Sequence, residues 1–194
     1  SPAVFYRVNQ LFIDAFFKIT LGQERDLAGM PSNIEECWRT IELKTATAYS
    51  AACAAGALVG TEDPKLIEAC HIFGHHLGLA IQIFNDMESI WQPDGLSDLK
   101  QGKLTLPLVY GLTFEHAYRD ELLSLVKADE IKTNSERIKE ILDIIDTRSF
   151  LIWGALKQRE AALNAIKICP QTEGREFLES YVTGMFGDID ALLQ

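Results

Sequence analysis

The stretch GHHLGLAIQIFND, residues 74–86, decides the fold class of this 194-residue chain. It is an apolar run that looks buried, yet it ends in Asn85 and Asp86, and more acids and amines follow. The helical pattern begins at Asp63-Pro64, which supplies an N-cap and a first-turn proline. It continues to about Trp91 before a Pro-Asp-Gly turn breaks it. A long, mostly buried helix with polar residues near its end is therefore expected.

The segments on either side also have helical periodicity. Apolar residues three or four positions apart predict an amphipathic first helix: Phe5, Val8, Phe12, Phe16 and Ile19. A capping box at Ser32-x-x-Glu35 predicts a second helix that runs to about Gly60. Further helices are expected near residues 104–114, 117–128, 134–147, 149–168 and 173–193. Since the sequence shows no β-alternation, residues 1–194 are predicted to form a single all-α bundle domain.

Small residues indicate close contact between the second and third predicted helices. The second is rich in alanine, and the third carries Gly74 and Gly78 four positions apart. Each of these glycines costs ~1 kcal/mol of helix propensity relative to alanine. Two explanations are open: tight helix packing, or room for a ligand.

Composition and charge narrow the class of protein. With 47% hydrophobic and 24% charged residues, the chain has the make-up of a globular domain. A formal net charge of −10 argues against nucleic acid and anionic membranes as partners. The longest charge-free run, residues 45–61, is rich in alanine and glycine and falls short of a bilayer span. The four cysteines form no CxxC pair, which favours free thiols and a cytoplasmic location.

Polar residues occupy positions where the helical period predicts core. They come from three predicted helices: Gln23 and Asp26 from the first, Lys44 and Thr45 from the second, and Gln82, Asn85, Asp86 and Ser89 from the third. Burying an unpaired charge costs several kcal/mol, so these groups must pair with one another or face a wet cavity. Taken together, they predict a polar pocket at one end of the bundle.

The chemistry of this pocket suits a metal–phosphate site. Carboxylate and amide oxygens are ligands for Mg²⁺, which is usually held by few protein carboxylates and shares its remaining positions with phosphate and water. Lys44 and Lys103 can then neutralise the remaining phosphate charge. The predicted arrangement is acids on the metal, metal on the phosphate, and lysines completing the neutralisation.

Four motifs in this chain resemble, in the same order, those of the trans-isoprenyl diphosphate synthase (polyprenyl synthetase) family. They are GQERDL (22–27), KTA (44–46), GHHLGLAIQIFND (74–86) and SDLKQGKLTLP (97–107). The resemblance implies an isoprenoid-synthase-type helical bundle, usually a homodimer. It also implies an Mg²⁺-dependent reaction in which isopentenyl diphosphate attacks the cation formed from an allylic diphosphate.

The resemblance also implies roles for individual residues. The catalytic residues would be Lys44, Thr45 and Gln82. The residues that contact the substrates would be Lys44, Gln82, Lys103, Gln23 and Asp98. The metal ligands would be Asp86, Asn85 and Ser89.

The chain departs from the family pattern in three places. The second acidic motif, normally Asp-Asp-x-x-Asp, reads Asn-Asp-Met-Glu-Ser over residues 85–89. The lysine usually found four residues before Asp98 is replaced by Asp94. The first Asp-rich motif, which would precede residue 1, is absent, so the sequence resembles the carboxy-terminal half to two-thirds of a synthase. A fragment is favoured over a split half or a degenerate subunit, and it would expose the faces that the missing helices cover.

Other functions remain open from the sequence. Asn85 and Ser89 also resemble the start of the metal triad of class I terpene cyclases, although Pro93 interrupts that triad unless Asp94 substitutes. Prenyl transfer to a different acceptor, or a non-catalytic role as a synthase subunit, would also be compatible. The residues that set product length in the family lie near the missing motif.

Overall fold

A computed structural model describes residues 1–28, 33–92, 104–127, 131–185 and 187. Every regular element in these ranges is a helix, which confirms the predicted all-α class. In chain order the elements are α1 (Pro2–Ala28), α2 (Ile34–Ile41), the π-helical turn η1 (Glu42–Ala46), α3 (Thr47–Gly60), α4 (Pro64–Trp91), α6 (Leu106–Thr113), α7 (Arg119–Lys127), α8 (Ile131–Ile144), α9 (Thr147–Ala165), the 3₁₀ turn η2 (Ile166–Ile168) and α10 (Glu173–Gly184). No helix in the described ranges is long and apolar enough to cross a bilayer.

The helix predicted from the capping box begins one residue later than expected. Its N-cap is Asn33, whose side chain accepts a hydrogen bond of 2.9 Å from the backbone N–H of Glu36. An Asn side chain at this position satisfies an otherwise unpaired N–H of the first turn. From there α2, η1 and α3 continue as one rod with right-handed helical backbone at each junction.

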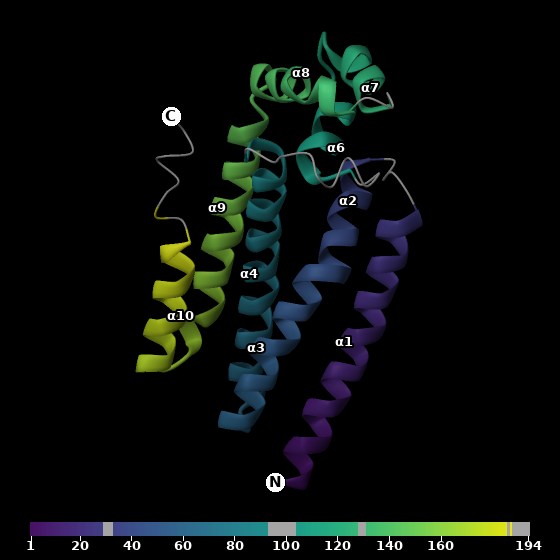
Figure 1. Cartoon of the computed structure of the whole chain (residues 1–194). Coiled ribbons are helices and arrows are strands. Elements are labelled where there is room, and N and C mark those ends of the chain that lie inside the picture. The colour runs from purple at the N-terminus through teal and green to yellow at the C-terminus, as the bar shows by residue number, and fades with distance from the viewer. Residues whose placement is uncertain (29–32, 93–103, 128–130, 186, 188–194) are drawn as a thin grey trace.

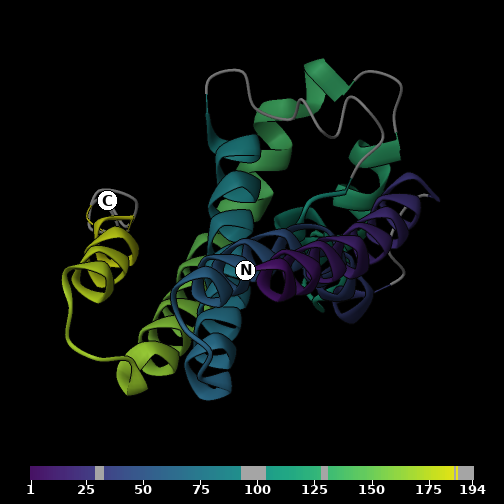
Figure 2. The same ribbon diagram turned by 90° about the horizontal axis from the view of Figure 1, so that it is seen from below.

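Helix α4 lies between α3 and α9 (Figures 1 and 2). A Cβ atom on Gly74 would overlap the carbonyl oxygen of Tyr49, and one on Gly78 would lie 2.8 Å from the Cα of Ala46. Both glycines therefore serve tight packing between backbones, which decides between the two explanations that the sequence left open. On the other side, His76 Nδ1 lies 2.8 Å from Gln158 Oε1 of α9.

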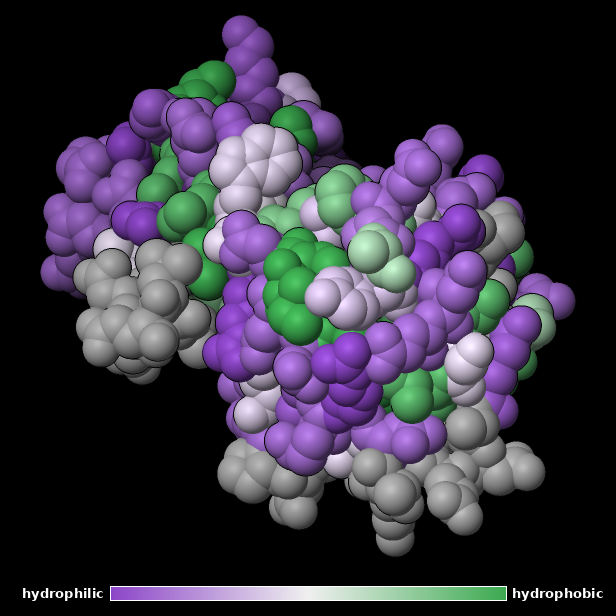
Figure 3. Space-filling view, turned by 90° about the horizontal axis from the view of Figure 1, so that it is seen from above, coloured by the Kyte–Doolittle hydropathy of each residue, from purple (hydrophilic) through white to green (hydrophobic). Residues whose placement is uncertain are grey.

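The core has two parts. The larger one surrounds α4 and includes Phe73 and Ile83, both fully buried. The smaller one joins the end of α4 to α6, α7 and α8, through residues such as Leu108 and Leu142. At the end of the molecule that carries α6, α7 and α8, polar side chains cover most of the surface between small apolar patches (Figure 3).

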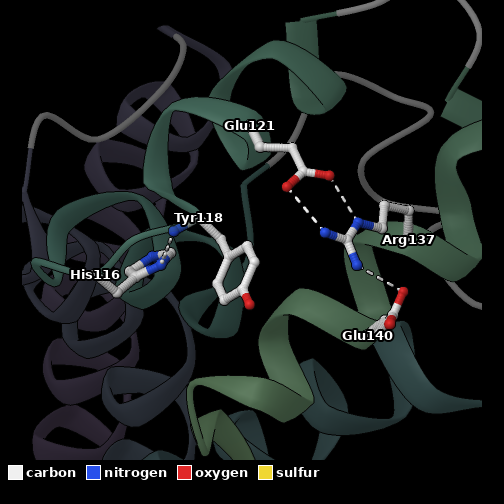
Figure 4. A network of polar contacts seen from close by, with 5 residues as sticks. All are labelled: His116, Tyr118, Glu121, Arg137 and Glu140. Carbon is white, nitrogen blue, oxygen red and sulfur yellow. Dashed lines mark hydrogen bonds and ion pairs between the residues drawn. The ribbon is translucent and has the colours of Figure 1, made fainter.

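Helices α7 and α8 are also joined by a polar network (Figure 4). The Arg137 guanidinium donates to both oxygens of Glu121, at 2.6 and 2.9 Å, and to Glu140 at 2.8 Å. The same guanidinium lies 5.6 Å from the ring centroid of Tyr118, whose backbone N–H donates to His116 Nδ1. These charges are exposed, so they orient the two helices more than they stabilise the fold.

The predicted apolar face of α1 is only partly buried: Val8 and Ile19 are half-buried, and its three phenylalanines are exposed. Phe5 is 72% exposed and Phe16 is 67% exposed, whereas the buried residues of α1 are Ala15 and Gly22. Small residues lie on the inner side because they allow α1 to approach α3 and η1 closely. The large aromatic side chains of α1 therefore face outward.

Candidate functional site

Three elements bring the predicted polar residues together near the C-terminal half of α4. Gly22 lets the end of α1 approach η1, since a Cβ at this position would lie 2.9 Å from the backbone nitrogen of Lys44. Gly78 brings η1 against α4 in the same way. We call the resulting group the polar cluster; it consists of Asp26, Lys44, Thr45, Gln82 and Asp86.

The turn that carries Lys44 and Thr45 is π-helical. The hydroxyl of Thr47 donates a hydrogen bond of 3.0 Å to the carbonyl oxygen of Glu42, five residues earlier. A single π turn widens the helix and changes the direction in which its side chains point, and such turns are frequent at functional sites. The sequence analysis predicted an uninterrupted helix here and missed the π turn.

A chain of hydrogen bonds links η1, α4 and α6. Thr45 Oγ1 donates a hydrogen bond of 2.7 Å to Gln82 Oε1, and Gln82 Nε2 donates one of 2.7 Å to Asp86 Oδ1. The second oxygen of Asp86 accepts the backbone N–H of Leu106 at 2.9 Å. Two residues assigned to the reaction centre by sequence resemblance, Thr45 and Gln82, are thus in direct contact.

Lys44 forms an ion pair with Asp26, with 2.6 Å between Nζ and Oδ2. The two side chains are 35% and 23% exposed, so solvent still reaches the ammonium group. Helical spacing had placed Asp26 on the same side as Gln23, and the structure shows that Asp26 is the partner of Lys44. Gln23 itself is half-buried and lines an open, mostly apolar hollow of about 650 Å³ at the end of α1.

A buried thiol lies beside the acids of the polar cluster. Burial, together with the negative charges of Asp86 and Asp26, raises the pKa of Cys37 from 9.0 to about 12. The sequence predicts only a free thiol at this position, because its closeness to the two acids depends on how α1, α2 and α4 pack.

The predicted metal ligands occupy different environments. Asn85 is exposed, and Ser89 is half-buried, with its hydroxyl donating 2.8 Å to the carbonyl oxygen of Asp86. Asp86 is only 5% exposed, and each of its carboxylate oxygens accepts a hydrogen bond from the protein. Asp86 thus differs from the other two predicted ligands in its burial and its protein partners. Lys103, Asp98 and Asp94 lie outside the described residues.

The remaining oxygen donors fit a cation only in part. Within the described ranges, no three His, Cys, Asp or Glu side chains are grouped so as to hold a metal ion. Near the end of α4 the oxygen donors outside the core include the amide of Asn85, the carboxylate of Glu88 and the half-buried hydroxyl of Ser89. An Mg²⁺ ion held by such a set needs phosphate and water oxygens to complete its coordination.

A separate cleft of about 360 Å³ lies between α1, α3 and α4, near the beginning of α4. Residues from all three helices line it, among them Tyr6, Leu58 and His71. His71 and Gln82 are eleven residues apart on α4, so the cleft and the polar cluster are separated by about 16 Å along the helix.

The sequence is similar to a known protein family and to several of its curated members. The family model described as polyprenyl synthetase matches residues 3–145. The short chain isoprenyl diphosphate synthase of Methanothermobacter thermautotrophicus is 31% identical over 178 residues, which are 86% of this chain and 54% of that protein. The geranylgeranyl diphosphate synthase of Mycobacterium tuberculosis is 35% identical over 127 residues, 61% of this chain and 36% of that protein. The chain thus spans about a third to a half of these relatives.

A comparison with solved structures supports the same fold. The geranylgeranyl pyrophosphate synthetase from Pyrococcus horikoshii superposes with a TM-score of 0.85 and 23% sequence identity. The match covers 96% of this chain and 60% of that one. The isoprenoid-synthase-type bundle predicted from the sequence is therefore confirmed as the fold.

Proposed function

This chain belongs to the polyprenyl synthetase family, and from that premise we propose that it forms part of a prenyltransferase in isoprenoid biosynthesis. The reaction would condense an allylic diphosphate with isopentenyl diphosphate. The observation that carries the proposal is the contact of Thr45 with Gln82 beside Lys44, because it places uncharged oxygen atoms and one ammonium group at the same end of the bundle.

The chemistry requires the carbon–oxygen bond of the allylic diphosphate to break, which leaves an allylic cation and a free diphosphate. Lys44 stabilises the diphosphate by a charge-assisted hydrogen bond, for which its ammonium group turns from Asp26 toward the substrate. Thr45 and Gln82 direct oxygen atoms toward the developing cation. Isopentenyl diphosphate then attacks the cation through its double bond, and loss of a proton completes the new unit.

Asn85 and Ser89 are the residues of α4 that would hold Mg²⁺ together with the diphosphate. When bound, the metal would neutralise charge on the leaving group. Lys103, which the sequence resemblance assigns to the same diphosphate, and Asp98, assigned to the substrates, complete the proposed set, along with Gln23 at the end of α1.

A second function has support from one observation. The exposed position next to Asp86 carries an amide, Asn85, where the family pattern has a carboxylate. An amide and a hydroxyl bind Mg²⁺ more weakly than two carboxylates, and the same residue types occur in the metal triad that the sequence resembles in terpene cyclases. A cyclase-like enzyme, or one that transfers the prenyl group to another acceptor, would ionise the same substrate without isopentenyl diphosphate.

The deciding experiment measures pyrophosphate release by the full natural protein with Mg²⁺ and geranyl or farnesyl diphosphate. Release that depends on isopentenyl diphosphate is the expected result. Release in its absence would replace chain elongation by cyclisation or by transfer to another acceptor. No release under either condition would replace both by a non-catalytic role as a synthase subunit.

Two further properties belong to the same proposal. We infer a homodimer, because α1 exposes a stripe of aromatic side chains. We also infer a cytoplasmic location, since all four cysteines are free thiols and such thiols persist in a reducing compartment.

A further inference from the structure

The hydrogen bonds from Thr45 to Gln82 and from Gln82 to Asp86 both run in one direction. The residue at the buried end, Asp86, sets that direction. We propose that Asp86 is a positioning residue, which orients Gln82 and Thr45 for the reaction and anchors the start of α6, and that it is not a metal ligand. This inference rests on the proposed prenyl transfer and concerns the same site.

The direction follows from the hydrogen-bonding capacity of each group. An ionised carboxylate only accepts, so the Gln82 amide must turn its NH₂ toward Asp86 Oδ1. Gln82 Oε1 then faces Thr45 and requires the single hydroxyl proton of that residue. With its proton used in this way, the Thr45 oxygen has only lone pairs left for the substrate. A buried anion thereby makes Thr45 an acceptor, which is the polarity that a developing cation or a departing proton needs.

The second oxygen of Asp86 has a different partner, the backbone N–H of Leu106 at the first position of α6. The next residue, Pro107, has no N–H, and the N-cap residue Thr105 makes no side-chain cap. Asp86 therefore caps α6 from another helix, and a carboxylate at a helix N-terminus is also favoured by the helix dipole. This contact connects the reaction centre to the beginning of α6.

Asp86 and its neighbour Asn85 differ in their exposure to solvent. Asp86 is 5% exposed, with a donor on each carboxylate oxygen, whereas Asn85 is exposed on the adjacent position of the helix. Each Asp86 oxygen keeps a second lone pair, but the carboxylate is buried and its charge is already shared with the Gln82 amide and the Leu106 N–H, which makes it a poorer ligand than an exposed group. Asn85 is such an exposed group.

The first test separates metal binding from positioning in the full natural protein. Calorimetry would measure the binding of inorganic pyrophosphate as a function of Mg²⁺ concentration for Asp86→Asn and for Asn85→Ala. Asp86→Asn should leave the Mg²⁺ dependence within about threefold of the natural protein, and Asn85→Ala should weaken it by about tenfold or more. A weakening of tenfold or more in Asp86→Asn would overturn the proposal and restore Asp86 as a ligand. This readout does not depend on turnover.

The second test concerns direction. In Asp86→Asn, the new amide can still accept from Leu106 N–H but offers an NH₂ donor to Gln82, so the Gln82 amide turns over and presents its own NH₂ to Thr45. Thr45 then accepts a hydrogen bond from Gln82 and turns its own proton toward the substrate, so kcat should fall by about 100-fold with KM for the allylic diphosphate nearly unchanged. The double variant Asp86→Asn/Gln82→Glu exchanges the carboxylate and the amide, so that Thr45 donates again.

The double variant should therefore recover at least about tenfold of the lost kcat. An unchanged kcat in Asp86→Asn, or no recovery in the double variant, would overturn the directional role. If the natural protein itself releases no pyrophosphate, the proposed function fails on that result alone, and the calorimetric test still decides whether Asp86 binds metal.

Discussion

Lys44 has one partner in the structure and another in the proposed reaction. Its ion pair with Asp26 is partly exposed, and pairs of this kind contribute about 0–1 kcal/mol, so the ammonium group can leave Asp26 at small cost. A diphosphate offers it more charge than a single carboxylate does. The ion pair therefore orients Lys44 when substrate is absent, and it is weak enough for the ammonium group to move to a diphosphate.

Replacing Lys44 by alanine should weaken binding of pyrophosphate with Mg²⁺ by about 10- to 100-fold, the value of a hydrogen bond between charged groups. Asp26→Asn should bind pyrophosphate as tightly as the natural protein or more tightly, because it releases Lys44. Calorimetry on the full protein measures both. Lys65→Ala, an exposed lysine in the first turn of α4, is the matched control and should have no effect. Equal affinities in all variants would make Lys44 a structural residue.

Cys37 should protect its proton up to high pH. Its pKa is about 12 in the folded chain and 9.0 when unperturbed, so between these values the folded state holds a proton that the unfolded state has lost. Stability from this group is complete below pH 9.0 and is lost as the pH rises toward 12. Unfolding by denaturant between about pH 8 and pH 11 should show a decline that is smaller in Cys37→Ala. An identical decline in both proteins would show that other groups cause it.

At the scale of helices, the periodicity of the sequence was sufficient for most elements. The long helix through residues 74–86 and the rod from α2 to α3 were predicted because apolar spacing and caps are local signals. The π turn was not, because no local sequence signal marks it. The outward face of α1 was also mispredicted, since periodicity shows that a helix has an apolar side but not what covers that side.

The same division applies to the polar cluster. Thr45 and Gln82 were placed together from helical spacing and family resemblance, and the structure joins them. The hydrogen bond from Leu106 to Asp86 could not be predicted, because it joins two helices through a backbone N–H, whereas Gln82 lies only four residues before Asp86 on α4. Pro107, the second residue of α6, was the one local signal in the sequence. Because proline has no N–H, the first turn of α6 has fewer N–H groups that need an acceptor, and the N–H of Leu106 is one of them.

Replacing Gly78 should disturb the contact between η1 and α4 by more than it gains in helix propensity. Gly78→Ala places a methyl group 2.8 Å from the Cα of Ala46, so η1 must move away from α4, and this should cost about 1–3 kcal/mol of stability and reduce prenyl transfer. Gly56→Ala in α3 is the control, because nothing lies within 4 Å of its added Cβ; it should stabilise by up to about 1 kcal/mol. Denaturant unfolding measures both changes. A stabilised Gly78→Ala would show that η1 and α4 are not in close contact.

For the whole molecule, the main feature is the surface of α1. Aromatic and aliphatic side chains form a stripe of adjacent pairs along its exposed side, and its members are Phe5, Tyr6, Phe12, Ile13, Phe16 and Phe17. The pairs recur at intervals of four or seven residues, so they lie on one side of the helix. A largely apolar stripe of this length, interrupted by Asn9, is unusual on a surface that faces water and indicates contact with another chain or segment.

If a second copy of the protein covers this stripe, a single charge placed in it should separate the two copies. Phe16→Glu puts an unpaired carboxylate into the contact, and sedimentation velocity on the full natural protein should then show a monomer in place of a dimer. Phe177→Glu on α10 is the matched control, since Phe177 is 65% exposed and Phe16 is 67% exposed, and it should remain a dimer. A dimer that survives Phe16→Glu would assign the stripe to a segment of the same chain, and dissociation by both substitutions would point to a general effect of surface charge. Gln23 and Asp26 lie at the other end of α1, and Asp26 pairs with Lys44 of η1. Loss of the dimer should therefore reduce activity only if it moves α1 relative to η1.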